Sequence, residues 1–230
     1  MTLGNRLPEM KPSHHQQTLE TGLAVGAPLA LAVLETFHPH PHDLFHLDLQ
    51  TWLLVHYLQL PLFPLAALAM MVLVRGRSGF AVAMCRVGMF VFAVTYTALD
   101  TSAGVVTGVL VKAARASSTP EAWRAPVREV VVAVWTHPII GGAPGAVPLL
   151  AVLGTVAWLL GALAAAIVVC RAGCSWTPVV LLVVSGLGLL VFKTPSWPGG
   201  PVTFGSLAAA AAWLHWEQTA RAKPDRDWAA

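Results

Sequence analysis

The 230-residue chain is 56% hydrophobic, only 11% of its residues are charged, and its net charge is +3. A soluble domain of this length needs a more highly charged surface, so the composition argues against one and predicts an integral membrane protein. The modest positive charge is spread along the chain and does not predict nucleic-acid binding. Three cysteines are too few for a disulfide framework.

Apolar runs of nearly spanning length repeat along the chain, which predicts an all-α, polytopic transmembrane helix bundle with about six spans. The runs cover residues 19–37, 49–74, 79–113, 146–170, 175–194 and 200–217. The last run is short between Pro201 and Glu217, so five spans plus a re-entrant segment is the alternative. No internal repeat is evident, which argues against an inverted-repeat transporter.

Polar tails at residues 1–18 and 218–230 flank a single transmembrane domain at 19–217. The first tail has no apolar run followed by a cleavage site, so we expect no signal peptide. With six spans and a cytoplasmic N-terminus, the greater share of Lys and Arg lies inside, as the positive-inside rule requires. We therefore expect a multi-pass protein of the cell membrane with both termini in the cytoplasm.

The connection between the third and fourth runs is the longest polar segment between spans. Thr119 and Pro120 resemble a helix start, and a valine stripe follows at helical spacing. The stripe contains Val127, Val130, Val131 and Val134. We expect a short interfacial helix here, lying on the outer membrane surface or capping the bundle.

A G-x3-G pair, Gly104 and Gly108, occurs in the third run. Small residues at this spacing allow close approach of two membrane helices. In a chain with several spans of its own, we expect the pair to pack within the chain rather than to mediate dimerisation.

The stretch FHPHPHDLFHLD, residues 37–48, forms the expected outer loop between the first two spans. Its prolines make the first part stiff and extended. After Pro41 a helix is expected, which would place His42 and His46 on one face with Asp43 beside them. Imidazoles with a carboxylate are recurrent ligands of Zn and Cu, so the loop predicts a metal site. The alternative is a solvated, stiff connector without a ligand.

The neighbouring spans carry polar residues at a similar expected depth. Glu35 ends the first span, His56 and Gln59 project from the second, and Asp100 lies in the third. A lipid-facing carboxylate costs on the order of 2.5 kcal/mol or more, so we expect Asp100 to face the bundle interior and to pair with His56. A structural hydrogen bond between helices is the simpler interpretation of this pair, and a functional site or proton pathway is the alternative.

These residues together form the predicted extracytoplasmic metal site for Cu or Zn. Its members are Glu35, His38, His40, His42, Asp43, His46, His56 and Asp100. Haem is disfavoured, because His56 has no second intramembrane histidine at its depth. No catalytic residue is assigned.

Three functions follow from this interpretation. The first is binding of Cu or Zn for transport or for delivery to a partner membrane protein. The second is a non-catalytic structural subunit of a larger membrane complex. The third is a membrane metalloenzyme acting on a lipid-like or small substrate, with Asp100 or Glu35 as general base. The sequence contains none of the common nucleotide-binding, hydrolase or zinc-protease motifs, and the lipid bilayer is its expected environment.

Overall fold

The computed structural model describes residues 14–39, 43–141, 148–193 and 195–222, and within them the chain is helical without a strand. This confirms the expected all-α class. The helices are α1 (His14–Glu35), α2 (Leu49–Leu73), α3 (Phe80–Leu99), α4 (Val106–Ala116), α5 (Pro120–Trp135), α6 (Leu149–Arg171), α7 (Trp176–Phe192) and α8 (Gly199–Ala222). Two short elements join them: the 3-10 turn η1 (Leu44–His46) and the π-helical turn η2 (Asp100–Val105).

Among the described residues, four segments are long and apolar enough to cross a membrane. They are Thr18–Glu35, Leu49–Leu73, Phe80–Ala116 and Leu149–Arg171. α7 is equally apolar in character but has only 17 residues. The chain therefore has the helices of a multi-pass membrane protein, and the count of six spans stays a prediction.

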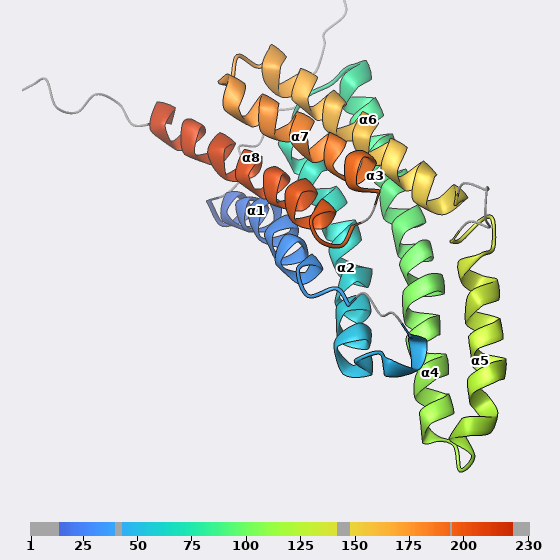
Figure 1. Cartoon of the computed structure of the whole chain (residues 1–230). Helices are drawn as coiled ribbons and strands as arrows, with labels where there is room; N and C mark the ends of the chain where they lie inside the picture. The colour runs from blue at the N-terminus through green and yellow to red at the C-terminus, as the bar shows by residue number, and fades with distance from the viewer. Residues whose placement is uncertain (1–13, 40–42, 142–147, 194, 223–230) are drawn as a thin grey trace, which may run out of the picture.

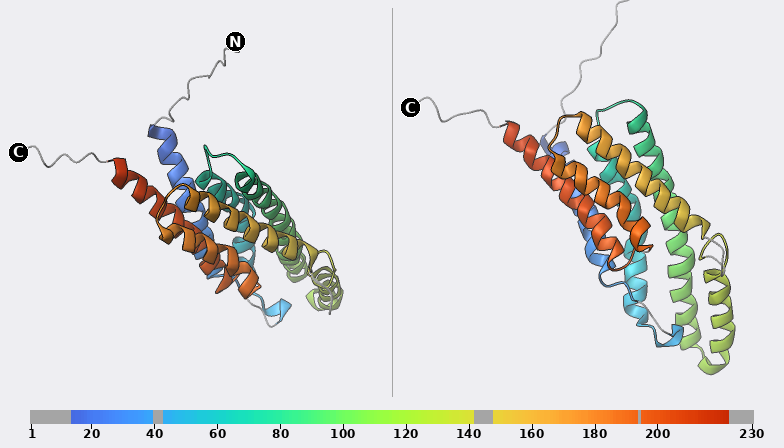
Figure 2. Two further views of the ribbon diagram at one scale, coloured as in Figure 1. Left: turned by 90° about the horizontal axis from the view of Figure 1, so that it is seen from above. Right: turned by 45° about the horizontal axis from the view of Figure 1, so that its top comes forward.

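The long helices lie side by side in one bundle (Figures 1 and 2). α3 packs along α6, and α8 packs against both α1 and α7. Glu20 of α1 pairs with Arg75 after α2, and Glu217 of α8 accepts a hydrogen bond from Ser175 before α7. These contacts place the start of α1 and the last turns of α8 at one end of the bundle, here called the tail end. The opposite end, from which α4 and α5 project, is called the hairpin end (Figure 1).

Aromatic rings fill the centre of the bundle, where helices from both halves of the chain meet. Ring centroids lie 4.5–6.4 Å apart, mostly in edge-on or tilted arrangements. The rings belong to Phe63, Phe92, Tyr96, Trp158 and Phe204. Such pairs favour edge-on geometry because the positive edge of one ring meets the negative face of another. The cluster fixes α2, α3, α6 and α8 relative to one another.

Glycines bring α3 and the turn after it close to their neighbours. A Cβ on Gly88 would lie 2.6 Å from the carbonyl oxygen of Ala157, so α3 and α6 touch through their backbones. A Cβ on Gly104 would overlap the ring of His56, and one on Gly108 would overlap the side chain of Leu53. The G-x3-G pair thus packs against α2 of the same chain, which confirms the expected intramolecular role.

α3, η2 and α4 form one continuous rod of 37 residues. At about 1.5 Å per residue the rod is about 55 Å long, well beyond the roughly 30 Å hydrocarbon core of a bilayer. The rod is therefore longer than the hydrocarbon core is thick, and α4 forms its part at the hairpin end (Figure 2).

The helix expected between the third and fourth spans is α5, which runs alongside α4 (Figure 1). Val127 and Val131 of α5 are buried against Val111 and Ala114 of α4. Val130 is 49% exposed, so the expected four-valine face is wrong at this position. The two buried valines are four residues apart and therefore lie on the one face of α5 that packs against α4.

Candidate functional site

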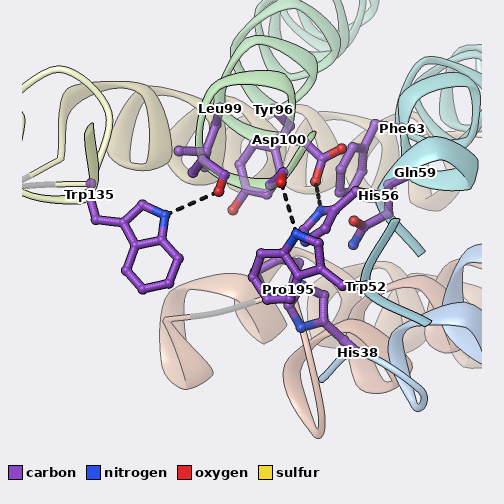
Figure 3. Close-up of a pocket in the computed structure, with 13 residues that line it drawn as sticks. His38, Trp52, His56, Gln59, Phe63, Tyr96, Leu99, Asp100, Trp135 and Pro195 are labelled. Atoms are coloured by element: carbon purple, nitrogen blue, oxygen red, sulfur yellow. Dashed lines mark hydrogen bonds and ion pairs between the residues drawn. The ribbon is translucent and has the colours of Figure 1, made fainter. Parts of the chain in front are cut away.

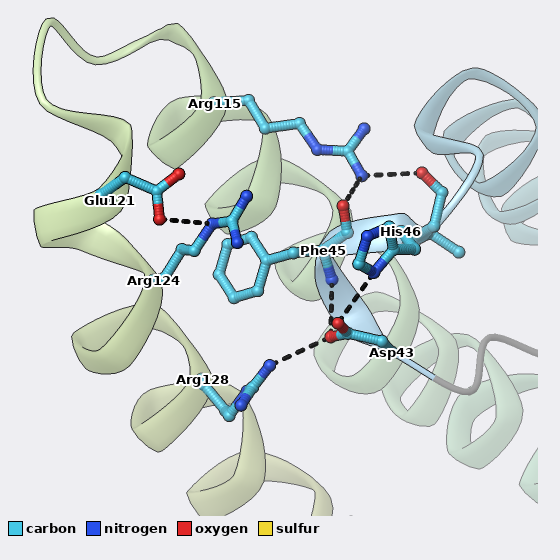
Figure 4. A network of polar contacts seen from close by, with 8 residues as sticks. Asp43, Phe45, His46, Arg115, Glu121, Arg124 and Arg128 are labelled. Carbon is cyan, nitrogen blue, oxygen red and sulfur yellow. Dashed lines mark hydrogen bonds and ion pairs between the residues drawn. The ribbon is translucent and has the colours of Figure 1, made fainter.

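The loop after α1 is anchored by Asp43, which caps η1. Its carboxylate accepts hydrogen bonds from the Phe45 backbone N–H at 3.2 Å and from His46 Nδ1 at 2.8 Å, and it pairs with Arg128 of α5 at 3.1 Å (Figure 4). Asp43 is extended, with φ −133° and ψ 130°, because it caps the turn from outside. The helix expected to place His42 and His46 on one face is therefore wrong at Asp43, and His42 itself lies outside the described residues.

Arginines from α4 and α5 surround this turn (Figure 4). Arg115 donates to the carbonyl oxygens of Phe45 and Leu47 at 2.9 and 2.8 Å. Arg124 and Arg128 lie 5.7 and 5.9 Å from the Phe45 ring centroid, within cation–π range. The Phe45 backbone N–H, followed by His46, holds the pKa of the Asp43 carboxyl below its usual value. The loop is thereby fastened to the helical hairpin.

A cavity of about 350 Å³ lies at the hairpin end of the bundle, between α2, η2 and the connections of other helices. His38 follows α1, Gly141 precedes α6, and Pro195 lies between α7 and α8. The remaining lining residues are Trp52, His56, Gln59, Phe63, Tyr96, Leu99, Asp100, Ala103, Gly104 and Trp135. Figure 3 shows these side chains around one polar pair.

That pair is His56 of α2 and Asp100 of η2, as expected from the sequence. Nδ1 of His56 lies 2.5 Å from Oδ1 of Asp100, and both residues are buried, with 5% and 8% exposed. A neutral imidazole facing a carboxylate through Nδ1 carries its proton there, which leaves a lone pair on Nε2. Within the described chain, His56 Nε2 and Asp100 Oδ2 have no hydrogen-bond partner.

The π-helical turn η2 positions both sides of this pair. It carries Asp100 at its start, and Gly104 leaves room for the imidazole. The indole N–H of Trp52 donates to the Gly104 carbonyl at 2.8 Å, and that of Trp135 donates to the Ala103 carbonyl at 3.1 Å. π turns inside α-helices recur at functional sites. Here the turn contacts both α2 and α5 and carries Asp100, so these elements together form one wall of the cavity.

A second buried pair lies next to the cavity. Gln59 Nε2 donates to Glu35 Oε1 at 2.7 Å, and the two residues are 1% and 0% exposed. Gln59 lines the cavity and Glu35 does not, so Glu35 sits behind Gln59. Oε2 of Glu35 and Oε1 of Gln59 have no hydrogen-bond partner among the described residues.

The eight residues of the predicted metal site do not form one cluster where the structure describes them. His38 lies beside His56, with ring centroids 5.1 Å apart, and its Nδ1 contacts the Pro39 carbonyl oxygen at 3.1 Å. His46 is separate, with 79% of its side chain exposed on η1. No group of three or more His, Cys, Asp or Glu side chains suited to a metal occurs in the described ranges. His40 and His42 lie outside those ranges.

Several wall residues were not assigned to the site from the sequence. Trp52 precedes His56 by four residues, so helical spacing places both on one face of α2, and this signal could have identified it. Gln59 was expected at the depth of His56, and it does line the cavity. Trp135, in contrast, comes from a distant helix, and no local pattern indicates its position.

The geometry combines a buried carboxylate–imidazole pair, an unpaired Nε2 and an open cavity with aromatic walls. Such a pair can accept a hydrogen bond or a proton, and it can also present a metal ligand whose orientation the carboxylate fixes. Comparison of the chain with family models, with curated proteins and with solved structures finds no match.

Proposed function

We propose that this integral membrane protein binds a small ligand in the cavity at the hairpin end, and that His56 and Asp100 hold it. The supporting observation is that His56 and Asp100 line the cavity, and that His56 Nε2 and Asp100 Oδ2 are buried without a partner in the described chain. A buried polar atom without a partner costs about 1–3 kcal/mol, which a ligand that supplies the missing hydrogen bond recovers. In the orientation that the positive-inside rule favours, with the N-terminus in the cytoplasm, this cavity would face the extracytoplasmic side.

The pair has a clear division of roles in this proposal. His56 Nε2 accepts a hydrogen bond or a proton from the ligand, while Asp100 holds the Nδ1 proton and stabilises an imidazolium when one forms. No Ser, Cys or Lys is among the described residues that line the cavity. The imidazole–carboxylate pair is suited to binding a ligand and to exchanging a proton with it.

Chemical modification of the purified protein tests whether the imidazole is open to small molecules. Diethyl pyrocarbonate acylates accessible, unprotonated imidazoles, and peptide mass spectrometry locates the products. We expect His56 to react, with exposed His46 as the internal reference. A His56→Gln variant confirms the peptide assignment. Complete reaction of His46 with an unreacted His56 would mean that the cavity is closed, and the proposal would be abandoned.

A second candidate is the transition-metal site for Cu or Zn. It is favoured by the adjacent rings of His38 and His56 and by the carboxylate behind His56, because metal-bound histidines commonly donate their other ring nitrogen to a carboxylate. In this case the ion would be the cargo of transport or of delivery to a partner.

Elemental analysis of the protein purified without chelator, after growth with Cu and Zn, tests this candidate. We expect near-stoichiometric metal in the parent protein, loss of the metal in His56→Ala, and retention in the matched variant His46→Ala. Loss of the metal in both variants would mean that the loop at residues 37–48 contributes ligands. A parent protein without metal would rule out this candidate.

A further inference from the structure

The unpaired polar atoms at the cavity are acceptors, which indicates the kind of ligand that complements them. On the basis of the proposed binding function, we infer that the ligand is a compact cation with N–H donors, a protonated primary amine. Three observations support this class: the unpaired acceptors, the distribution of charge and the aromatic walls.

The first observation is the hydrogen-bond balance. The unpaired atoms of residues that line the cavity are Asp100 Oδ2, Gln59 Oε1 and His56 Nε2. Each belongs to a side chain that is more than nine-tenths buried. A carboxylate oxygen and an amide oxygen can only accept, and so can Nε2 when Nδ1 carries the proton. A primary ammonium group offers three N–H donors, and a hydroxyl offers one.

The second observation is charge. Asp100 is the acidic residue of the lining, and the described lining contains no Lys or Arg. Arg115 and Arg128 at the same end are engaged by backbone carbonyls and by Asp43. A buried carboxylate attracts a cation, because the low-dielectric walls strengthen the field inside the cavity.

The third observation is the aromatic lining, formed by Trp52, Phe63, Tyr96 and Trp135. The indole N–H groups of both tryptophans are already used by η2 carbonyls, so these rings offer the ligand apolar and π surface rather than donors. Aromatic faces attract ammonium groups, and they also cover the alkyl part of an amine. The volume of about 350 Å³ is at the small end for ligand sites, which suits a compact amine.

Calorimetric titration of the full chain in detergent at pH 7.5 tests the inference with two probes of equal carbon skeleton, n-butylamine and n-butanol. We expect the protonated amine to bind at least about tenfold more tightly, because a hydrogen bond to a charged group contributes about 1.5–3 kcal/mol. This comparison uses the parent protein alone and does not depend on whether any variant folds.

Asp100→Asn is the test variant, and Asp48→Asn is the matched control, because Asp48 caps α2 outside the cavity and Asn caps equally well. We expect the Kd for butylamine to rise at least about tenfold in Asp100→Asn and to stay unchanged in Asp48→Asn. The weaker binding of butanol should be the same in all three proteins.

Equal affinity for the two probes would overturn the inference that the ligand is a protonated amine. Binding of Cu or Zn without binding of butylamine would overturn it as well. If His56 still reacts with diethyl pyrocarbonate, such a result is consistent with a ligand-binding cavity and rejects only the inferred class of ligand. With His56 unreactive, the proposed function fails as well.

Discussion

Replacement of Gly104 by Ala should destabilise the protein by about 1.5–3.5 kcal/mol. The new Cβ would overlap the His56 ring, which is enclosed by Trp52 and Asp100 and cannot turn away freely. Overpacking costs about 1–3 kcal/mol, and displacing His56 from the carboxylate costs about 1.5 kcal/mol more. The higher helix propensity of Ala offsets about 1 kcal/mol of this sum.

Gly26→Ala in α1 is the matched control, because a Cβ on Gly26 would have no atom within 4 Å. It should leave stability unchanged or raise it by up to about 1 kcal/mol. Unfolding of both variants in mixed micelles by increasing dodecyl sulfate, followed by circular dichroism, gives the two free energies of unfolding. If Gly104→Ala is as stable as Gly26→Ala, the tight contact between η2 and the imidazole does not exist and the described cavity wall is incorrect.

Three further outcomes concern the hairpin end. Trp135→Phe removes the indole hydrogen bond to η2 and should cost about 1 kcal/mol, seen as faster amide hydrogen exchange in α5; unchanged exchange would contradict this. Val131→Ala should increase tryptic cleavage of the hairpin, because Val131 is buried against α4, whereas Val132→Ala, at a 48% exposed position, should not. Because hydrogen bonds lower the pKa of Asp43, its contacts should persist above the usual carboxyl pKa of about 3.9 and be lost as the pH falls through the lower folded value. NMR titration of the Asp43 carboxyl carbon measures this, and a midpoint at or above the usual value would refute it.

The parts of the structure that the sequence predicts are those with a local physical cause. Lipid requires every backbone polar group to be paired within its own segment, so apolar runs must become helices. A carboxylate among membrane helices needs a partner, which predicts the pairing of Asp100 with His56 before any helix contact is known. The packing of Gly104 within the chain is also predictable, because a chain with several spans supplies neighbouring helices of its own.

The cavity wall could not be predicted, because it depends on which connections meet in space. His38, Gly141 and Pro195 come from three separate connections, and no spacing relates them. The sequence also predicts one cluster where the structure separates the loop residues, since His46 bonds to Asp43 on η1 and leaves 79% of its side chain exposed.

The π turn sets the rotation of α4 about its own axis relative to α3. A π turn contains one residue more than an α turn, and one residue of α-helix corresponds to a rotation of about 100° and a rise of about 1.5 Å. Deleting one residue from η2 would therefore rotate all of α4 about its helix axis by about 100° and shift it along that axis by about 1.5 Å. Val111 and Ala114 would then face away from α5, and the hairpin would lose its apolar seam while α3 kept its place. One extra residue in η2 thus determines which face α4 turns toward α5.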